Sequence, residues 1–194
     1  MSGQPRDELP LEAKVADRLG VLPHFFRLGH EAPEIAENLW SFAEFAYLDN
    51  PLPALFKERL FVYLSRFCEV RYCIARHVGF LVGLGRPSGD RQCDPEMIDQ
   101  VVQLIRRPLP RGEDLEPCLA DLESLASHLL QAPEPDTPLE AAVFACATHT
   151  FLQSPQAAAC LAALRHAFQP ATFQHLLLFL SFVRTAHFWT KVHP

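Results

Sequence analysis

Proline divides this chain into short segments, and this division limits its fold more than any other feature. Seventeen prolines fall mostly between stretches whose apolar residues recur at helical spacing. Because proline lacks a backbone N–H and its ring clashes with the preceding turn, it ends helices or opens them at the first position. No stretch alternates apolar and polar residues over a useful length, so no strand is expected. The sequence therefore predicts an all-α fold.

Helix-end residues place the individual segments. Gly20 is a typical stop signal, and Thr137-Pro138 is a typical start, because threonine caps a helix and proline fits its first position. The proline-rich stretch at about 106–118 is predicted to be a connector, as is 132–138. A short segment at 23–28 follows the first helix. The predicted helices cover residues 11–19, 33–48, 53–67, 71–84, 94–105, 119–130, 138–153, 156–168 and 171–191.

The order of segments repeats faintly along the chain. Residues 33–105 and 137–194 each run as helix, proline break and helix, but aligning them requires an insertion. A duplication into two half-repeats and an unrelated second half therefore both stay open. In either case we expect one helical domain over residues 1–194.

Composition and charge exclude several classes of protein. The net charge of -6 arises from interspersed signs, which argues against a nucleic-acid partner because such proteins present a clustered basic face. The longest unbroken apolar run, 157–164, is far shorter than the roughly 20 residues of a membrane helix. The polar N-terminus lacks a secretory pattern. We therefore expect a cytoplasmic protein without a membrane partner.

Six irregularly spaced cysteines do not form a disulfide framework typical of an exported chain. The expected state of each is a reduced, buried thiol. A zinc site from Cys68, Cys73 and His77 would lack the Cys-x2-Cys spacing of structural zinc sites. The sequence therefore predicts no metal and no cofactor.

Cys73 and His77 form the candidate centre. They are four residues apart in the predicted helix 71–84, so they share one face. An imidazole that takes the proton of a thiol produces the reactive thiolate, and Cys73 lies near the helix N-terminus, where the macrodipole also favours that anion. The pair is therefore a candidate thiol and base.

Glu58 lies on the preceding predicted helix. If the chain reverses near 68–71, Glu58 is about ten residues before the bend and His77 about seven after it, so both lie at similar heights. A carboxylate at that place would orient the imidazole. The apolar neighbours of Glu58 allow it to face inward. We therefore expect Glu58, Cys73 and His77 to meet in one pocket.

These residues resemble the core of the carboxymuconolactone decarboxylase and alkylhydroperoxidase D-like family. The likeness extends over residues 52–104 and implies an alkylhydroperoxidase D-like helical bundle that forms homo-oligomers. In the hydroperoxidase branch, the motif is a glutamate, then Cys-x-His-Cys, then a histidine four residues later. Glu58, Cys73 and His77 occupy three of those positions.

Two positions depart from the family motif. Val70 replaces the first cysteine, and Tyr72 replaces the histidine between the cysteines. The resemblance assigns the first cysteine to resolving the oxidised partner into a disulfide, so the usual dithiol cycle cannot run. Cys68 would be a substitute only with a different geometry, because it is five residues from Cys73.

A second resemblance concerns the whole chain. The stretch 179–194 is similar to the end of an N-terminal module that precedes PAS and kinase segments in bacterial sensor histidine kinases. This likeness implies a signal-input role within a longer chain. Arg184 and His187 lie in the apolar part of this stretch, where charged groups must be paired or face a cavity. We expect them either to line the pocket with Tyr72 or to meet a carboxylate at a dimer interface.

The sequence leads to three hypotheses about function. The first is an input domain that senses a ligand or thiol oxidation. The second is a thiol-dependent peroxidase in which Cys73 is the nucleophile, His77 the base and Glu58 the orienting group. The third is a decarboxylase-like enzyme in which Glu58 and His77 exchange protons with the substrate. Val70 counts against the peroxidase, so whether the chain is an enzyme stays open.

Overall fold

The computed structural model describes residues 10–27, 32–125, 129 and 131–192. Over these residues the chain is all-α, as predicted, and the only strand-like pairing is one isolated bridge between Leu129 and Phe168. The α-helices in this part of the chain are α1 (Leu11–Leu19), α2 (Pro33–Ala43), α3 (Ala54–Phe67), α4 (Arg71–Leu81), α5 (Ile98–Arg106), α6 (Glu116–Glu123), α7 (Pro138–Leu152), α8 (Ala157–Ala167) and α9 (Pro170–Val192).

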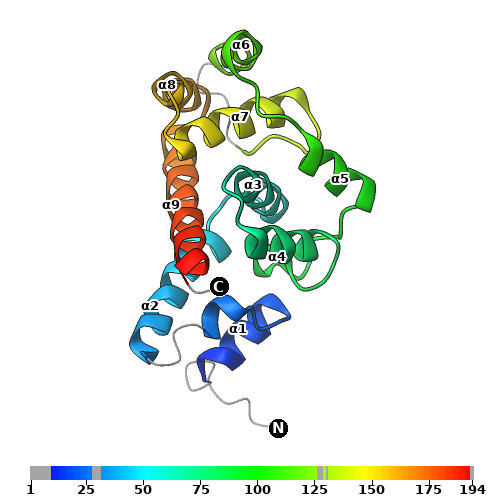
Figure 1. Cartoon of the computed structure of the whole chain (residues 1–194), viewed down its shortest axis with the longest axis vertical. Helices are drawn as coiled ribbons and strands as arrows, with labels where there is room; N and C mark the ends of the chain where they lie inside the picture. The colour runs from blue at the N-terminus through cyan, green and yellow to red at the C-terminus, as the bar shows by residue number, and fades with distance from the viewer. Residues whose placement is uncertain (1–9, 28–31, 126–128, 130, 193–194) are drawn as a thin grey trace.

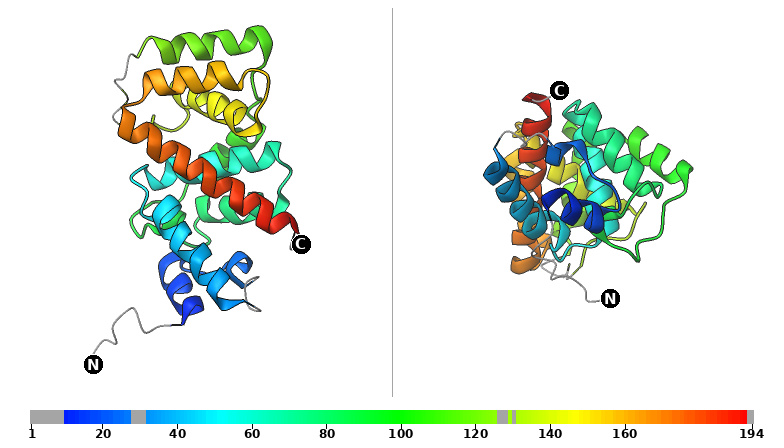
Figure 2. Two further views of the ribbon diagram at one scale, coloured as in Figure 1. Left: turned by 90° about the vertical axis from the view of Figure 1, so that its left-hand side faces the viewer. Right: turned by 90° about the horizontal axis from the view of Figure 1, so that it is seen from below.

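Helix α3 lies at the centre of the molecule and packs against α4, α5, α7 and α9 (Figure 1). Helices α6, α7 and α8 pack together at one end, and α1 and α2 lie at the other. The long helix α9 runs along one side between these two ends (Figure 2). None of the helices in the described ranges combines the length and hydropathy that crossing a membrane requires.

The central position of α3 places three consecutive charged residues in the interior. Lys57, Glu58 and Arg59 are 2%, 0% and 0% exposed. Buried charges are tolerated only where partners satisfy them. The Lys57 Nζ donates to the carbonyls of Tyr47 and Asn50 at 2.5 and 2.9 Å, and so caps the end of the π-helix Glu44–Leu48. Lys57 thereby joins α3 to the segment that precedes it.

Arg59 is satisfied on the opposite side by a network of carboxylates. Its Nε is 2.6 Å from Glu140, its second terminal nitrogen is 2.6 Å from Asp136, and it also pairs with Glu96. Glu140 and Asp136 are shared with Arg107. The network therefore joins α3 to the start of α7 and to the chain before α5.

Several predicted boundaries are confirmed. Helix α1 covers the predicted residues, and Thr137 caps α7, accepting a hydrogen bond from the backbone N–H of Glu140 at 3.1 Å. The predicted helix 71–84 begins at Arg71 as expected, but its predicted end was wrong. It ends at Leu81 because Gly83, at φ 90°, reverses the chain and the N–H of Leu84 bonds back to the Gly79 carbonyl.

Other boundaries were wrong. The predicted helix 33–48 changes to a π-helix at Glu44, and α5 begins only at Ile98. The connector 106–118 contains the 3-10 turn Gly112–Leu115 and the start of α6, where Pro117 occupies the first turn and so opens a helix rather than interrupting one. Helix α6 ends at Glu123, before the end predicted at residue 130. Residues 126–128 and 130 of that predicted helix lie outside the described residues. The same holds for residue 28 of the predicted segment 23–28 and for residues 193–194.

Replacing the buried arginine tests the role of this network. We expect Arg59→Met to lower the free energy of unfolding by about 3 kcal/mol or more, because it leaves the Glu96 carboxylate without an ion-pair partner and leaves Arg107 alone to compensate Glu140 and Asp136. Arg91→Gln is the matched control, since Arg91 pairs with Asp17 at 3.1 Å on the exposed surface, and we expect a change below about 0.5 kcal/mol. Urea denaturation measures both. Equal losses in the two variants would contradict a structural role for the network.

Candidate functional site

The hairpin of α3 and α4 brings Glu58 and His77 together. The helices are joined by residues 68–70, where Glu69 takes a positive φ of 56° that reverses the chain. The Nδ1 of His77 lies 2.7 Å from Oε2 of Glu58. Both side chains are buried, Glu58 completely and His77 with 8% exposed. The Glu58 carboxylate and the His77 imidazole, which the sequence predicts at similar heights along two antiparallel helices, are therefore in direct contact.

Hydrogen-bond donors surround the Glu58 carboxylate. Its Oε1 accepts from the backbone N–H of Ser88 at 2.6 Å, from the Ser88 hydroxyl at 3.2 Å and from the hydroxyl of Tyr47. Ser88 sits in the turn Pro87–Gly89 with a φ of 46°, a conformation that aims its N–H at the carboxylate. Because an ionised carboxylate only accepts, Nδ1 of His77 acts as the donor. When the ring is neutral, its free lone pair is therefore on Nε2.

Aromatic contacts fix the plane of the His77 ring. The ring stacks on Phe61 with centroids 3.6 Å apart and an interplanar angle of 16°. Tyr47 and Phe80 meet it edge-on at 6.0 and 5.6 Å. Within the described residues, Nε2 of His77 has no hydrogen-bond partner. This nitrogen is therefore available to a molecule beside the ring.

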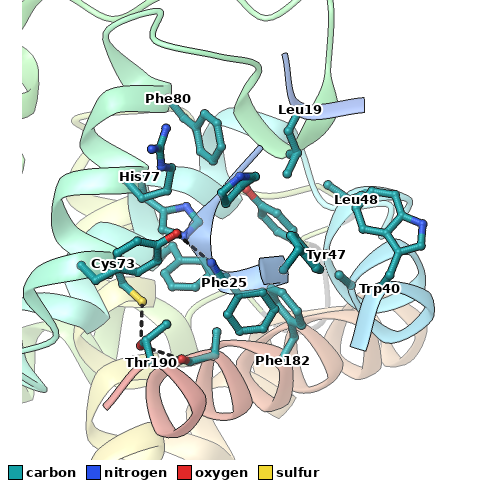
Figure 3. Close-up of a pocket in the computed structure, with 17 residues that line it drawn as sticks. Leu19, Phe25, Trp40, Tyr47, Leu48, Cys73, His77, Phe80, Phe182 and Thr190 are labelled. Atoms are coloured by element: carbon teal, nitrogen blue, oxygen red, sulfur yellow. Dashed lines mark hydrogen bonds between the residues drawn. The ribbon is translucent and has the colours of Figure 1, made fainter. Parts of the chain in front are cut away.

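An apolar cavity lies beside this ring (Figure 3). Its volume, measured as the space that the centre of a water molecule can reach, is about 40 Å³. In the part of the chain that the structure describes, no acidic side chain lines it. Its lining residues with aromatic rings, besides His77, are Phe25, Phe26, Trp40, Tyr47, Phe61, Tyr72, Phe80 and Phe182.

Cys73 also lines the cavity, but it does not bond to His77. Its Sγ lies 3.6 Å from the hydroxyl of Thr190 on α9, and Figure 3 shows the sulfur pointing that way. The side chain is 2% exposed, and burial raises the pKa of the thiol to about 11. The position of Cys73 near the helix N-terminus predicts a lowered pKa. The pKa is raised instead, because desolvation outweighs a macrodipole contribution of about 1 kcal/mol or less.

Cys68, the other cysteine considered for the site, does not line the cavity and supplies no second thiol there. Cys68 ends α3, is partly buried and is a free thiol like Cys73. Burial raises its pKa as well. Val70 is buried at the start of α4. The geometry therefore offers a single thiol at the cavity.

Of the three residues expected at the pocket, only Tyr72 lines it. On α9 the cavity face is formed by Phe182, Ala186 and Thr190, which recur every four residues. Arg184 is off this face, exposed, and donates to the Phe151 carbonyl. Arg184 therefore does not line this cavity, and the alternative that it meets a carboxylate at a dimer interface stays a prediction.

His187 is buried beside the cavity rather than within its lining. Its Nε2 is 2.8 Å from the hydroxyl of Ser65, and its ring meets those of Phe61 and Phe151 edge-on. Burial, followed by the charges of His77, Lys191 and Arg184, lowers its pKa to about 3. A neutral His187 therefore packs in the core behind the stack of Phe61 and His77.

Sequence reasoning missed four residues at the site: Tyr47, Phe61, Ser88 and Arg76. Tyr47 faces inward because the chain winds as a π-helix there, which shifts the helical register. Ser88 follows Pro87 in a short turn far from the motif. Arg76 is adjacent to His77 in sequence, and its position within an apolar helix is the one signal that would have identified it.

Comparisons of the chain with protein-family models, with curated proteins and with solved structures find no match. Among the described residues, no group of three or more histidine, cysteine or acidic side chains is placed to hold a metal ion. The chemistry of the site therefore has to be argued from the cavity, the Glu58–His77 pair and the groups around them.

The state of the Cys73 thiol can be tested by alkylation. We expect the rate of Cys73 alkylation by iodoacetamide to rise with pH to a midpoint near 11, because the thiol stays protonated below its raised pKa. Peptide mapping by mass spectrometry gives the rate at this position. The same chain unfolded in urea is the control and should titrate near the ordinary value of about 8.5. A midpoint below about 8 in the folded protein would establish an activated thiol instead.

Proposed function

We propose that this chain is a cytoplasmic signal-input domain that binds a small, mainly apolar ligand in the cavity, which is lined mainly by α4, α9 and residues within 19–26 and 40–48. The cavity carries this proposal. Protein interiors are close-packed and hold few voids of this kind. A concave space with aromatic walls and a few convergent polar groups is the usual form of a small-molecule site. The unpartnered Nε2 of His77 is one such group.

The position of α9 supports a sensing role. Phe182, Ala186 and Thr190 form one face of this helix over two turns, and all three line the cavity. A bound ligand would therefore contact α9 directly and bias its position. The proposal includes PAS or kinase segments of a longer chain that receive this change from α9. This part rests on the similarity of residues 179–194 to the end of an input module of sensor histidine kinases.

The alkylhydroperoxidase D-like fold is part of the same proposal. Its support is the α3–α4 hairpin, in which the contact of Glu58 with His77 joins two positions of the family motif. We also propose a homo-oligomer, at least a dimer. Exposed apolar side chains on α9 and beside α2 favour this, since Phe45 and Phe188 are each 67% exposed.

A second candidate is a decarboxylase-like enzyme that uses general acid–base chemistry. The Glu58–His77 pair favours it, because a carboxylate that holds Nδ1 leaves Nε2 able to take a proton from a substrate in the cavity. The thiol peroxidase is favoured less, since Cys73 bonds to Thr190 rather than to His77 and burial raises its pKa. In the acid–base enzyme His77→Gln would stop turnover, whereas Cys73→Ser would leave it unchanged.

Ligand binding can be followed through Trp40, which lines the cavity and is 5% exposed. The chain has two tryptophans, so Trp189→Phe leaves Trp40 as the sole emitter. We expect 1-hexanol, a neutral apolar probe, to change its emission in a saturable way. Adding Ala186→Leu should abolish the change, because the larger side chain fills the cavity.

The control is Ala162→Leu in the same background, since Ala162 is exposed on α8, away from the cavity. Circular dichroism verifies that each variant is folded. The proposal fails if hexanol produces no saturable change, or if Ala186→Leu responds as fully as Ala162→Leu does.

A further inference from the structure

Arg76 is a cation at an apolar cavity and has no acidic partner in the described part of the chain. It lies on α4 beside His77, is partly buried and lines the cavity. Its guanidinium packs over the ring of Phe80 at 5.7 Å, and its Nε is buried without a hydrogen-bond partner. Across the described ranges, Arg76 forms no ion pair, whereas Arg59 and Arg107 each meet at least two carboxylates. Among the residues that the structure describes, the charge of Arg76 therefore has no carboxylate partner.

Hydrogen-bond donors converge beside this guanidinium. The hydroxyl of Tyr72 accepts from the backbone N–H of Phe25 at 3.1 Å, so its own hydrogen remains free to donate. Arg76 is close enough to that hydroxyl to offset part of the rise that burial causes in the pKa of Tyr72. No acidic side chain lines the cavity within the described residues. The cavity therefore presents donors and positive charge to its contents.

The carboxylate of Glu58 does not oppose this charge. Donors from Tyr47, Ser88 and His77 occupy both of its oxygens, and Glu58 is not among the residues that line the cavity. An anion in the cavity would thus meet Arg76 first. A guanidinium pairs best with a planar carboxylate, which takes two parallel hydrogen bonds from it.

We propose that the ligand of this cavity is an apolar monocarboxylate, whose head pairs with Arg76 and the Tyr72 hydroxyl. Its hydrocarbon or aromatic body lies among the rings that include Phe25, Phe80 and Phe182. The inference rests on the ligand-binding function proposed above and names the chemical class of its ligand. Arg76 selects the head group, and the aromatic walls accept the body.

A matched pair of probes tests this assignment. Hexanoate and 1-hexanol share a six-carbon chain and differ in the charge of the head group. In the Trp189→Phe background, we expect hexanoate to bind at least tenfold more tightly than hexanol. Arg76→Gln should weaken hexanoate binding at least tenfold and change hexanol binding less than twofold. Titrations at constant ionic strength measure both affinities.

Arg71→Gln is the control variant, because it removes the same charge from an exposed position on the same helix, outside the cavity lining. It should leave both affinities unchanged. Equal binding of the two probes, or an equal loss of hexanoate binding in Arg71→Gln, overturns the carboxylate assignment and leaves the ligand-binding function standing. Binding of neither probe overturns both.

Discussion

The buried carboxylate of Glu58 holds the candidate site together. A charge taken fully out of water is expensive unless donors replace its hydration. Glu58 receives them from three separate segments: Tyr47 in the π-helix, His77 in α4 and Ser88 in the turn after α4. Each donor is also positioned by that carboxylate. The hydrogen bonds to this one carboxylate thus hold the segment before α3, the α3–α4 hairpin and the imidazole ring in place.

The neighbours of Glu58 extend the same arrangement in other directions. Successive helical residues point about 100° apart, so three adjacent side chains reach different parts of the fold. Lys57 caps the π-helix, although burial lowers its pKa to about 8. Arg59 reaches the carboxylates of Glu96, Asp136 and Glu140. Helix α3 therefore organises the molecule through charge as well as apolar packing, which is why a Lys-Glu-Arg run occurs in its core.

Much of the fold and part of the site follow from local rules. Thr137 and the proline spacing predict helix starts, and simple helix geometry predicts that Glu58 and His77 meet. The thiol differs because its protonation depends on burial against α9, over a hundred residues away in sequence. Tyr47 and Ser88 depend on a π-helix and a left-handed turn, which the motif does not encode. Long-range contacts and unusual backbone conformations therefore limit prediction at this site.

Glu58 holds Nδ1 of His77 as a donor and leaves Nε2 without a hydrogen-bond partner among the described residues. Long-range ¹H–¹⁵N correlation spectra of histidine-labelled protein report which ring nitrogen carries the proton. We expect Nδ1 of His77 to be protonated in the folded protein, and we expect Glu58→Met, which removes the acceptor, to abolish this preference. A neutral His77 ring protonated on Nε2, with a bare Nδ1, would contradict this assignment.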